Sequence, residues 1–181
     1  MPCEVTLIQE GDALCVCRKK RRDDAVLQVQ RTLRCADTRL LPQDAYRKIA
    51  AAVEGGAQFG CFTIGFDYDG PFMGCNTYFS NRRAKKGQIA FGDQGIFMTR
   101  DLFWQQNGFP DLPLMEDYEL SLRMKRQHIP LVVLDSTIIT SGRRYQRRFP
   151  LLTMGKMFWL RCLYRLGVDS QKIADMYRDI R

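Results

Sequence analysis

The sequence has few of the residues that build metal centres. It has one histidine, His128, and none of its seven cysteines belongs to a Cys-x-x-Cys pair. A zinc site is usually built from four Cys or His ligands, so few partners remain for one here. The odd cysteine count, together with the lack of a secretory leader pattern, favours reduced thiols in a cytoplasmic protein.

Long apolar runs are also lacking. No stretch reaches the roughly 18 uncharged apolar residues that a membrane-spanning helix needs, so we expect none. The chain also shows no internal repeat and no low-complexity linker, so no linker marks a domain boundary.

What the sequence does contain is a globular composition with an uneven charge. Its 181 residues are 45% hydrophobic and 27% charged, which fits one domain with a sizeable core. Of the net charge of +8, +7 falls on residues 140–181, where ten Lys or Arg face three acids. A basic end of this kind is typical of proteins that bind nucleic acid, an anionic membrane surface or a phosphate-bearing ligand, and composition alone does not choose among them.

Strand-like and helix-like patterns alternate along most of the chain. The first thirty residues differ from the rest, with two short strand-like runs, 4–8 and 13–17, before a charged run at 18–24 that is typical of a solvated loop. From Arg31 the alternation predicts an α/β layered domain with a mainly parallel or mixed sheet. The predicted helices are 41–56, 72–87, 100–109 and 113–129, and the predicted strands are 57–70, a short interrupted strand in 88–100, and 129–140.

Three groups of polar residues lie where such a domain usually has its functional residues. Asp37 lies where a strand is expected to end, Glu116 and Asp117 open a predicted helix, and the pair Arg143-Arg144 follows a buried strand. Each has an ordinary explanation as well. Acids before or within a first helical turn cap the helix or complement its dipole, and arginines after a strand are commonly a solvated surface. Taken singly, none of the three identifies a function.

Taken in order, these motifs resemble a known family. The chain reads Cys-Ala-Asp-Thr at 35–38, Gly-Asp-Gln-Gly at 92–95, NGFPDLPLMED at 107–117 and SGRRY at 141–145. This order resembles the inverting family-2-type glycosyltransferases of the GT-A fold, in particular a bacterial subgroup with H-A-D-T, G-D-Q-G, G-F-P-x-x-P-L-M-E-D and S-x-R-R-W. The likeness covers residues 31–181, including the tail. We therefore expect a GT-A-like layered αβα domain, with 31–181 as its catalytic and acceptor part and 1–30 as a divergent segment.

The resemblance implies a role for each matching residue. Asp37 would hold Mg²⁺ or Mn²⁺ on the donor diphosphate, and Asp117 would be the base that deprotonates the acceptor hydroxyl. Glu116 would hold the loop or contact the acceptor. The remaining implied binding residues are Asp93 and Gln94, which border the donor sugar and acceptor, and Arg143 and Arg144, near the leaving diphosphate.

The sequence also departs from that family. The motifs P-x-x-N-E and D-G-x-S-x-D, which hold the nucleotide base and ribose, do not occur before Arg31, so we expect the donor half of the fold to be truncated or replaced. Cys35 stands in place of histidine and Tyr145 in place of tryptophan. Two hypotheses follow: a glycosyltransferase that uses a nucleotide-diphospho-sugar and an unknown acceptor, or a truncated, non-catalytic module that binds or supports other molecules.

The basic tail has its own alternatives. Its apolar residues either pack in the core, lie on an anionic membrane surface as in a peripheral membrane protein, or form a homo-oligomer contact. Nucleic-acid binding is the weakest alternative, because the chain contains no recognised reader motif.

Overall fold

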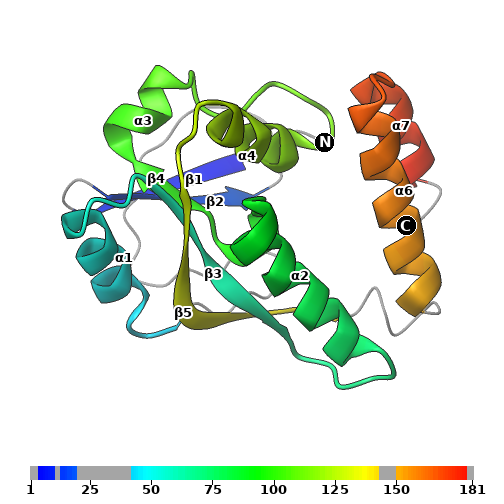
Figure 1. Cartoon of the computed structure of the whole chain (residues 1–181), viewed down its shortest axis with the longest axis horizontal. Helices are drawn as coiled ribbons and strands as arrows, with labels where there is room; N and C mark the ends of the chain where they lie inside the picture. The colour runs from blue at the N-terminus through cyan, green and yellow to red at the C-terminus, as the bar shows by residue number, and fades with distance from the viewer. Residues whose placement is uncertain (1–3, 11–12, 20–41, 143–149, 179–181) are drawn as a thin grey trace.

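The computed structural model describes residues 4–10, 13–19, 42–142 and 150–178 (Figure 1). Its centre is a mixed five-stranded sheet in the order β1-β2-β4-β3-β5. The strands are β1 (Glu4–Glu10), β2 (Ala13–Lys19), β3 (Phe59–Phe66), β4 (Phe97–Thr99) and β5 (Leu131–Thr140). The prediction of an α/β domain with a mixed sheet is therefore confirmed at this level.

The pairing combines one parallel pair with three antiparallel pairs. β3 and β5 run parallel, with Phe59 opposite Leu131, whereas β1–β2, β2–β4 and β3–β4 are antiparallel. The β3–β5 register shifts between Phe62 and Thr63, and the Thr63 hydroxyl donates a hydrogen bond to the Ser136 carbonyl at 2.9 Å beside this irregularity. The N-terminal hairpin pairs with β4, so the divergent segment extends the same sheet as the rest of the chain.

The four predicted helices are present with shorter bounds, and the structure adds a 3-10 turn and two helices in the tail. They are α1 (Ala45–Glu54), α2 (Met73–Gly87), the 3-10 turn η1 (Gly92–Gln94), α3 (Arg100–Gln105), α4 (Glu116–Arg126), α6 (Pro150–Arg165) and α7 (Ser170–Arg178). Within 88–100 only residues 97–99 form a strand, because η1 occupies the preceding loop. No helix in the described part of the chain is long and apolar enough to cross a membrane.

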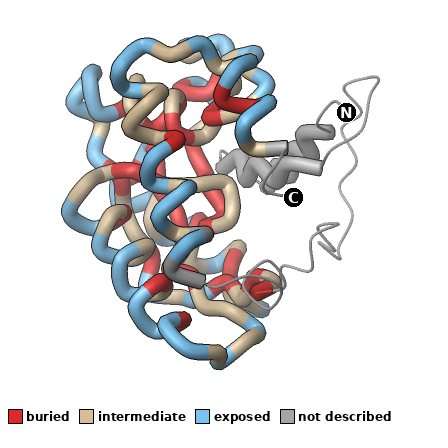
Figure 2. Tube along the Cα trace, turned by 90° about the vertical axis from the view of Figure 1, so that its right-hand side faces the viewer, coloured by how far each residue is buried: buried red, intermediate tan, exposed pale blue. Residues whose placement is uncertain are grey.

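Alternating side chains of the strands are buried in two separate cores. Phe59 of β3 and Met98 of β4 are buried with residues of α2, α3 and α4, such as Leu120. Phe62 of β3 and Phe97 of β4, whose side chains point to the opposite face, are buried with residues of α1 instead. Because successive strand residues point to opposite faces, helices cover both faces of the sheet. Figure 2 shows the buried positions gathered in the interior, with exposed positions along the outer sides of the helices.

The helices α6 and α7 form a third cluster at the side of the molecule away from α1 (Figure 1). Leu160 of α6 and Ile173 of α7 are buried with Ile89, Met115 and Tyr118. This cluster attaches the helical tail to the loop before η1 and to the start of α4.

Candidate functional site

Two predicted motifs meet at one point of the structure. The Gly92 N–H, which opens η1, donates a hydrogen bond to Asp117 Oδ2 at 2.7 Å, although 25 positions separate the two residues. Asp117 Oδ1 accepts a second hydrogen bond, from the Tyr118 N–H, also at 2.7 Å. We call η1 together with Glu116 and Asp117 the junction.

A side chain would be crowded at both glycines of the Gly-Asp-Gln-Gly motif. A Cβ at Gly92 would lie 3.3 Å from Asp117 Oδ2, so the backbone approaches the carboxylate more closely than most side chains allow. Gly95 has φ +61, and a Cβ there would lie 2.3 Å from Ile138 Cδ1 in the core. Glycine alone combines this left-handed backbone with the lack of a Cβ.

A left-handed residue also sets the start of α4. Met115 has φ 68, an uncommon conformation for a residue with a side chain, and it is 6% exposed. The turn it makes places Glu116 and Asp117 in the first helical turn, where the helix dipole favours negative charge. Glu116 is buried at 7% exposure, whereas Asp117 is half-buried. The predicted acidic pair therefore lies at the junction, with its two members in different environments.

Arg83 of α2 supplies positive charge to the junction. Its Nη2 donates a hydrogen bond to Gln94 Oε1 at 2.9 Å, its Nε donates to the Ile89 carbonyl at 3.3 Å, and its guanidinium carbon lies 3.7 Å from the centre of the Phe91 ring. Burial lowers the pKa of Arg83 to about 10, while the charges of Asp93 and Asp117 act in the opposite direction. The group is still a cation at neutral pH.

Gln94 and Asp93 contribute polar atoms that are buried. Gln94 is 0% exposed, and its Oε1 accepts from Arg83 and from the Phe91 N–H at 3.3 Å. Gln94 Nε2 and Asp93 Oδ1 are buried and have no hydrogen-bond partner among the residues that the structure describes. Buried polar atoms of this kind are uncommon in folded proteins and mark a place where a further partner would be favourable.

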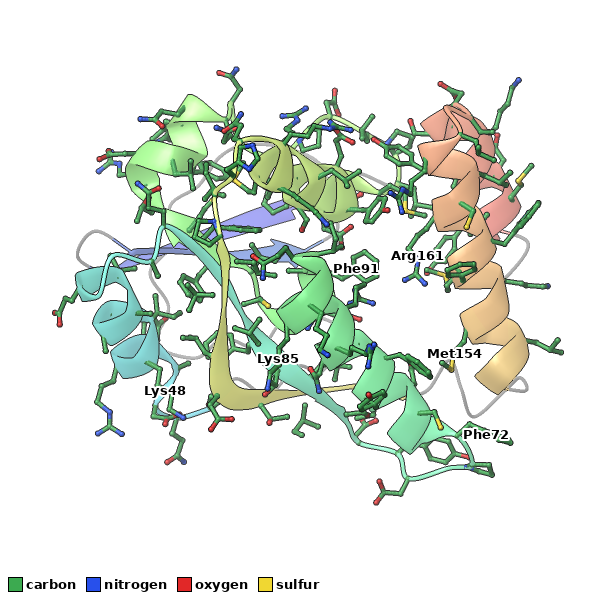
Figure 3. The ribbon with its side chains drawn as sticks, in the orientation of Figure 1. Lys48, Phe72, Lys85, Phe91, Met154 and Arg161 are labelled. Carbon is green, nitrogen blue, oxygen red and sulfur yellow. The ribbon has the colours of Figure 1, made fainter. Side chains whose placement is uncertain are left out.

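Arg161 of α6 also lies beside the junction. Figure 3 shows Arg161 pointing from α6 toward Phe91, and its guanidinium carbon lies 5.4 Å from the centre of that ring. The charge of Arg161 lowers the pKa of Arg83, so the two cations act on each other. Behind them, the Tyr164 hydroxyl donates a hydrogen bond to Glu119 Oε2 at 2.9 Å. Burial is the largest cause, and this hydrogen bond the next, of the pKa of Tyr164 being raised to about 12.

The structure thus brings together four of the seven predicted site residues, namely Asp93, Gln94, Glu116 and Asp117. The other three, Asp37, Arg143 and Arg144, lie outside the described residues, so their place at the site stays a prediction.

Sequence reasoning missed Arg83, because the segment NRRAKKG reads only as a basic helix end. No local signal separates it from the adjacent Arg82, because only the structure shows which side of α2 is buried.

The described residues do not form a metal centre. Across 42–142 and 150–178 there is no group of three or more His, Cys, Asp or Glu side chains that could hold a metal ion. Among the described residues, the carboxylates Asp93 and Asp117 both interact with the charge of Arg83.

The arrangement brings a carboxylate, a buried amide and a guanidinium together where two loops meet. Such a set can orient a hydroxyl, accept its proton and balance negative charge. Comparison of the chain with protein-family models, curated proteins and solved structures finds no match.

Proposed function

We propose that the chain is an inverting glycosyltransferase, which moves a sugar from a nucleotide-diphosphate donor to a hydroxyl acceptor. The observation that carries the proposal is the hydrogen bond from Gly92 to Asp117 Oδ2. It joins the two most specific motifs of the family resemblance, Gly-Asp-Gln-Gly and Pro-Leu-Met-Glu-Asp. An enzyme of that kind needs the loop beside the donor and acceptor to adjoin its base.

In this mechanism Asp117 is the base. Oδ2 accepts a hydrogen bond from the Gly92 N–H and Oδ1 accepts one from the Tyr118 N–H, so the carboxylate is held in one orientation. The acceptor oxygen attacks the anomeric carbon, the bond from that carbon to the diphosphate oxygen breaks, and the acceptor proton passes to Asp117. The leaving nucleoside diphosphate takes the electron pair of the broken bond.

In the proposal, arginines supply positive charge at two places, the junction and the leaving diphosphate. Arg83 balances the charges of Asp93 and Asp117 at the junction, since it is a cation with a pKa of about 10. Arg143 and Arg144 would bind the leaving diphosphate, because a planar guanidinium matches two phosphate oxygens at once. Asp37 stays the proposed ligand of Mg²⁺ or Mn²⁺, and none of the steps above depends on it.

One observation favours the second hypothesis, a non-catalytic module with the fold of such an enzyme. Both oxygens of Asp117 accept hydrogen bonds from backbone N–H groups, which is what a purely structural carboxylate at a helix start also does. In that case the junction binds a sugar or nucleotide, or only stabilises the fold, and no bond is broken.

The test is release of nucleoside diphosphate from a panel of nucleotide sugars with hydroxyl acceptors. Asp117→Asn should lower the rate by about 10²–10⁴-fold, because the amide does not take the proton. Asp111→Asn is the matched control, since Asp111 is exposed and lies in the same 107–117 motif. Full turnover by Asp117→Asn would contradict the assignment of the base.

Stability must be measured in parallel. An asparagine offers one oxygen where Asp117 uses two, so its NH₂ group would face one of the backbone donors. We expect Asp117→Asn to lose about 1–3 kcal/mol of unfolding free energy. From the sequence alone an intact fold would have been expected, because the amide is nearly isosteric with the carboxylate.

Titration calorimetry separates the two hypotheses. Because the nucleotide-binding motifs are missing, we expect only weak, metal-dependent binding of nucleotide sugars by this chain. Binding without turnover in any donor–acceptor combination would favour the non-catalytic module. Tight binding, with a free energy of roughly −8 kcal/mol or better, would show that the N-terminal hairpin rebuilds a nucleotide pocket.

A further inference from the structure

The outer side of α6 exposes large apolar side chains. Leu152 is 65% exposed, Phe158 63% and Trp159 61%, and Leu166, just after the helix, is 78% exposed. Leu152, Trp159 and Leu166 are seven positions apart, so they form one stripe along the helix. We call these four residues the outer face of α6.

The inner side of the same helix is already packed and hydrogen-bonded to the rest of the fold. Leu160 is 3% exposed and packs in the cluster with Ile89 and Ile173, and Tyr164 is bonded to Glu119. The fold therefore uses one side of α6 and leaves most of the outer face to water in the described structure, with the Arg161 guanidinium carbon 5.8 Å from the centre of the Phe158 ring. Exposed aromatic groups gathered in this way usually mark a surface that meets a partner.

The charges beside the outer face have one sign. Residues 150–165 contain no acid, and Lys156 and Arg165 are exposed next to the apolar stripe. The nearest acids in sequence are Asp169 and Asp175. Asp169 accepts hydrogen bonds from the first backbone N–H groups of α7, and Asp175 accepts one from Gln171.

This charge decides between the candidate partners. A second copy of the chain would bring two basic helices together, because residues 140–181 carry ten Lys or Arg against three acids. An anionic lipid surface attracts the same cations, and its interfacial layer accepts the Trp and Phe rings. We propose that α6 lies in the interfacial layer of an anionic lipid bilayer, with its outer face in the lipid and Lys156 and Arg165 at the phosphates. The inference does not depend on the proposed transferase activity.

The two tryptophans of the chain allow a direct test. Trp159 lies on the outer face and is 61% exposed, whereas Trp104 lies on α3 and is 59% exposed, so the two start from a similar exposure. In Trp104→Phe the remaining Trp159 should shift its fluorescence to shorter wavelength when phosphatidylcholine vesicles containing phosphatidylglycerol are added. In Trp159→Phe the remaining Trp104 should not shift. No shift in the first variant, or equal shifts in both, would overturn the proposal.

Co-sedimentation measures the charge contribution. Vesicles with phosphatidylglycerol should bind the chain and pure phosphatidylcholine vesicles should not, and salt of about 0.5 M should weaken the binding. Lys156→Gln with Arg165→Gln should lower the partition coefficient about 25-fold, since each cation contributes a factor of about five. Lys85→Gln with Lys86→Gln removes two exposed cations from α2 and should change it little (Figure 3 labels Lys85).

Two other results would assign the outer face to another partner. A concentration-dependent dimer that Trp159→Ser abolishes, without vesicle binding, would identify a second copy. Salt-sensitive nucleic-acid binding that needs Lys156 and Arg165, again without vesicle binding, would identify nucleic acid. Either outcome would overturn the lipid proposal. Trp159→Ser should leave the unfolding free energy within about 0.5 kcal/mol, because the side chain is exposed.

Discussion

The junction and the outer face of α6 lie on neighbouring elements but are built in opposite ways. At the junction polar groups are buried: Gln94 is 0% exposed, Glu116 is 7% exposed, and Arg83 stacks on Phe91. On α6 apolar groups are exposed, with Trp159 at 61% and Leu166 at 78%.

Each arrangement is costly for a protein that only needs to fold. A buried polar group loses its water and must recover hydrogen bonds inside the protein, whereas an exposed large apolar group forgoes the stabilisation of burial. Buried polar groups and exposed large apolar groups are more informative than other residues, because most exposed polar and buried apolar residues need no further explanation. In the proposals above, a sugar or nucleotide ligand is assigned to the junction and an anionic lipid surface to α6.

The largest expected effect on stability comes from changing the backbone of the junction. Gly95→Ala should lower the free energy of unfolding by about 2–4 kcal/mol, because alanine is strained at φ +61 and its Cβ would overlap Ile138 Cδ1. Gly74→Ala is the control, since a Cβ at this helical position meets nothing within 4 Å. It should raise stability by about 0.5–1 kcal/mol. Equal effects in urea denaturation would contradict the described loop geometry.

Removal of the charge at the junction should have the next largest effect. Arg83→Met loses the hydrogen bonds to Gln94 and Ile89 and the stacking on Phe91, and should cost about 2–3 kcal/mol of unfolding free energy. Arg82→Met is a neighbouring control, because Arg82 is exposed and bonds only the Tyr78 hydroxyl in the described contacts. Its effect should stay within about 0.5 kcal/mol. A loss within about 0.5 kcal/mol for Arg83→Met would show that Arg83 is an ordinary surface arginine.

The smallest effect is expected where α6 attaches to α4. Tyr164→Phe removes the hydrogen bond to Glu119 and should cost about 1 kcal/mol. The raised pKa of Tyr164, about 12, means that the folded state holds the phenolic proton more tightly than the unfolded chain. This contribution is therefore complete below pH of about 10 and is lost between pH of about 10 and 12.

Denaturation of both proteins across that pH range measures the effect. Wild-type stability should fall relative to Tyr164→Phe as the pH rises, because only the wild type has this proton to lose. A constant difference between the two proteins would show that the hydroxyl does not titrate in a bonded environment.

The sequence by itself determined the order and type of most elements. Helix start and stop signals, helical spacing of apolar residues and a β-branched run predicted the helices near 45–54, 73–87 and 116–126 and the strands near 59–66 and 131–140, because these signals are local. The resemblance assigned the Gly-Asp-Gln-Gly loop and Asp117 to one site, and in the structure the Gly92 N–H donates a hydrogen bond to Asp117 Oδ2.

The tertiary structure decided what local pattern does not contain. Arg82 and Arg83 are identical in type and adjacent in sequence, yet only Arg83 lies at the junction, because the side of α2 that faces the core is fixed by packing against β3 and η1. The N-terminal hairpin joins the sheet through β4, a long-range pairing that its own residues do not specify. Likewise, the apolar residues of α6 divide into Leu160, which packs against α7 and α4, and Trp159, which does not. Burial depends on which surfaces meet in space, and that is settled only when the whole chain has folded.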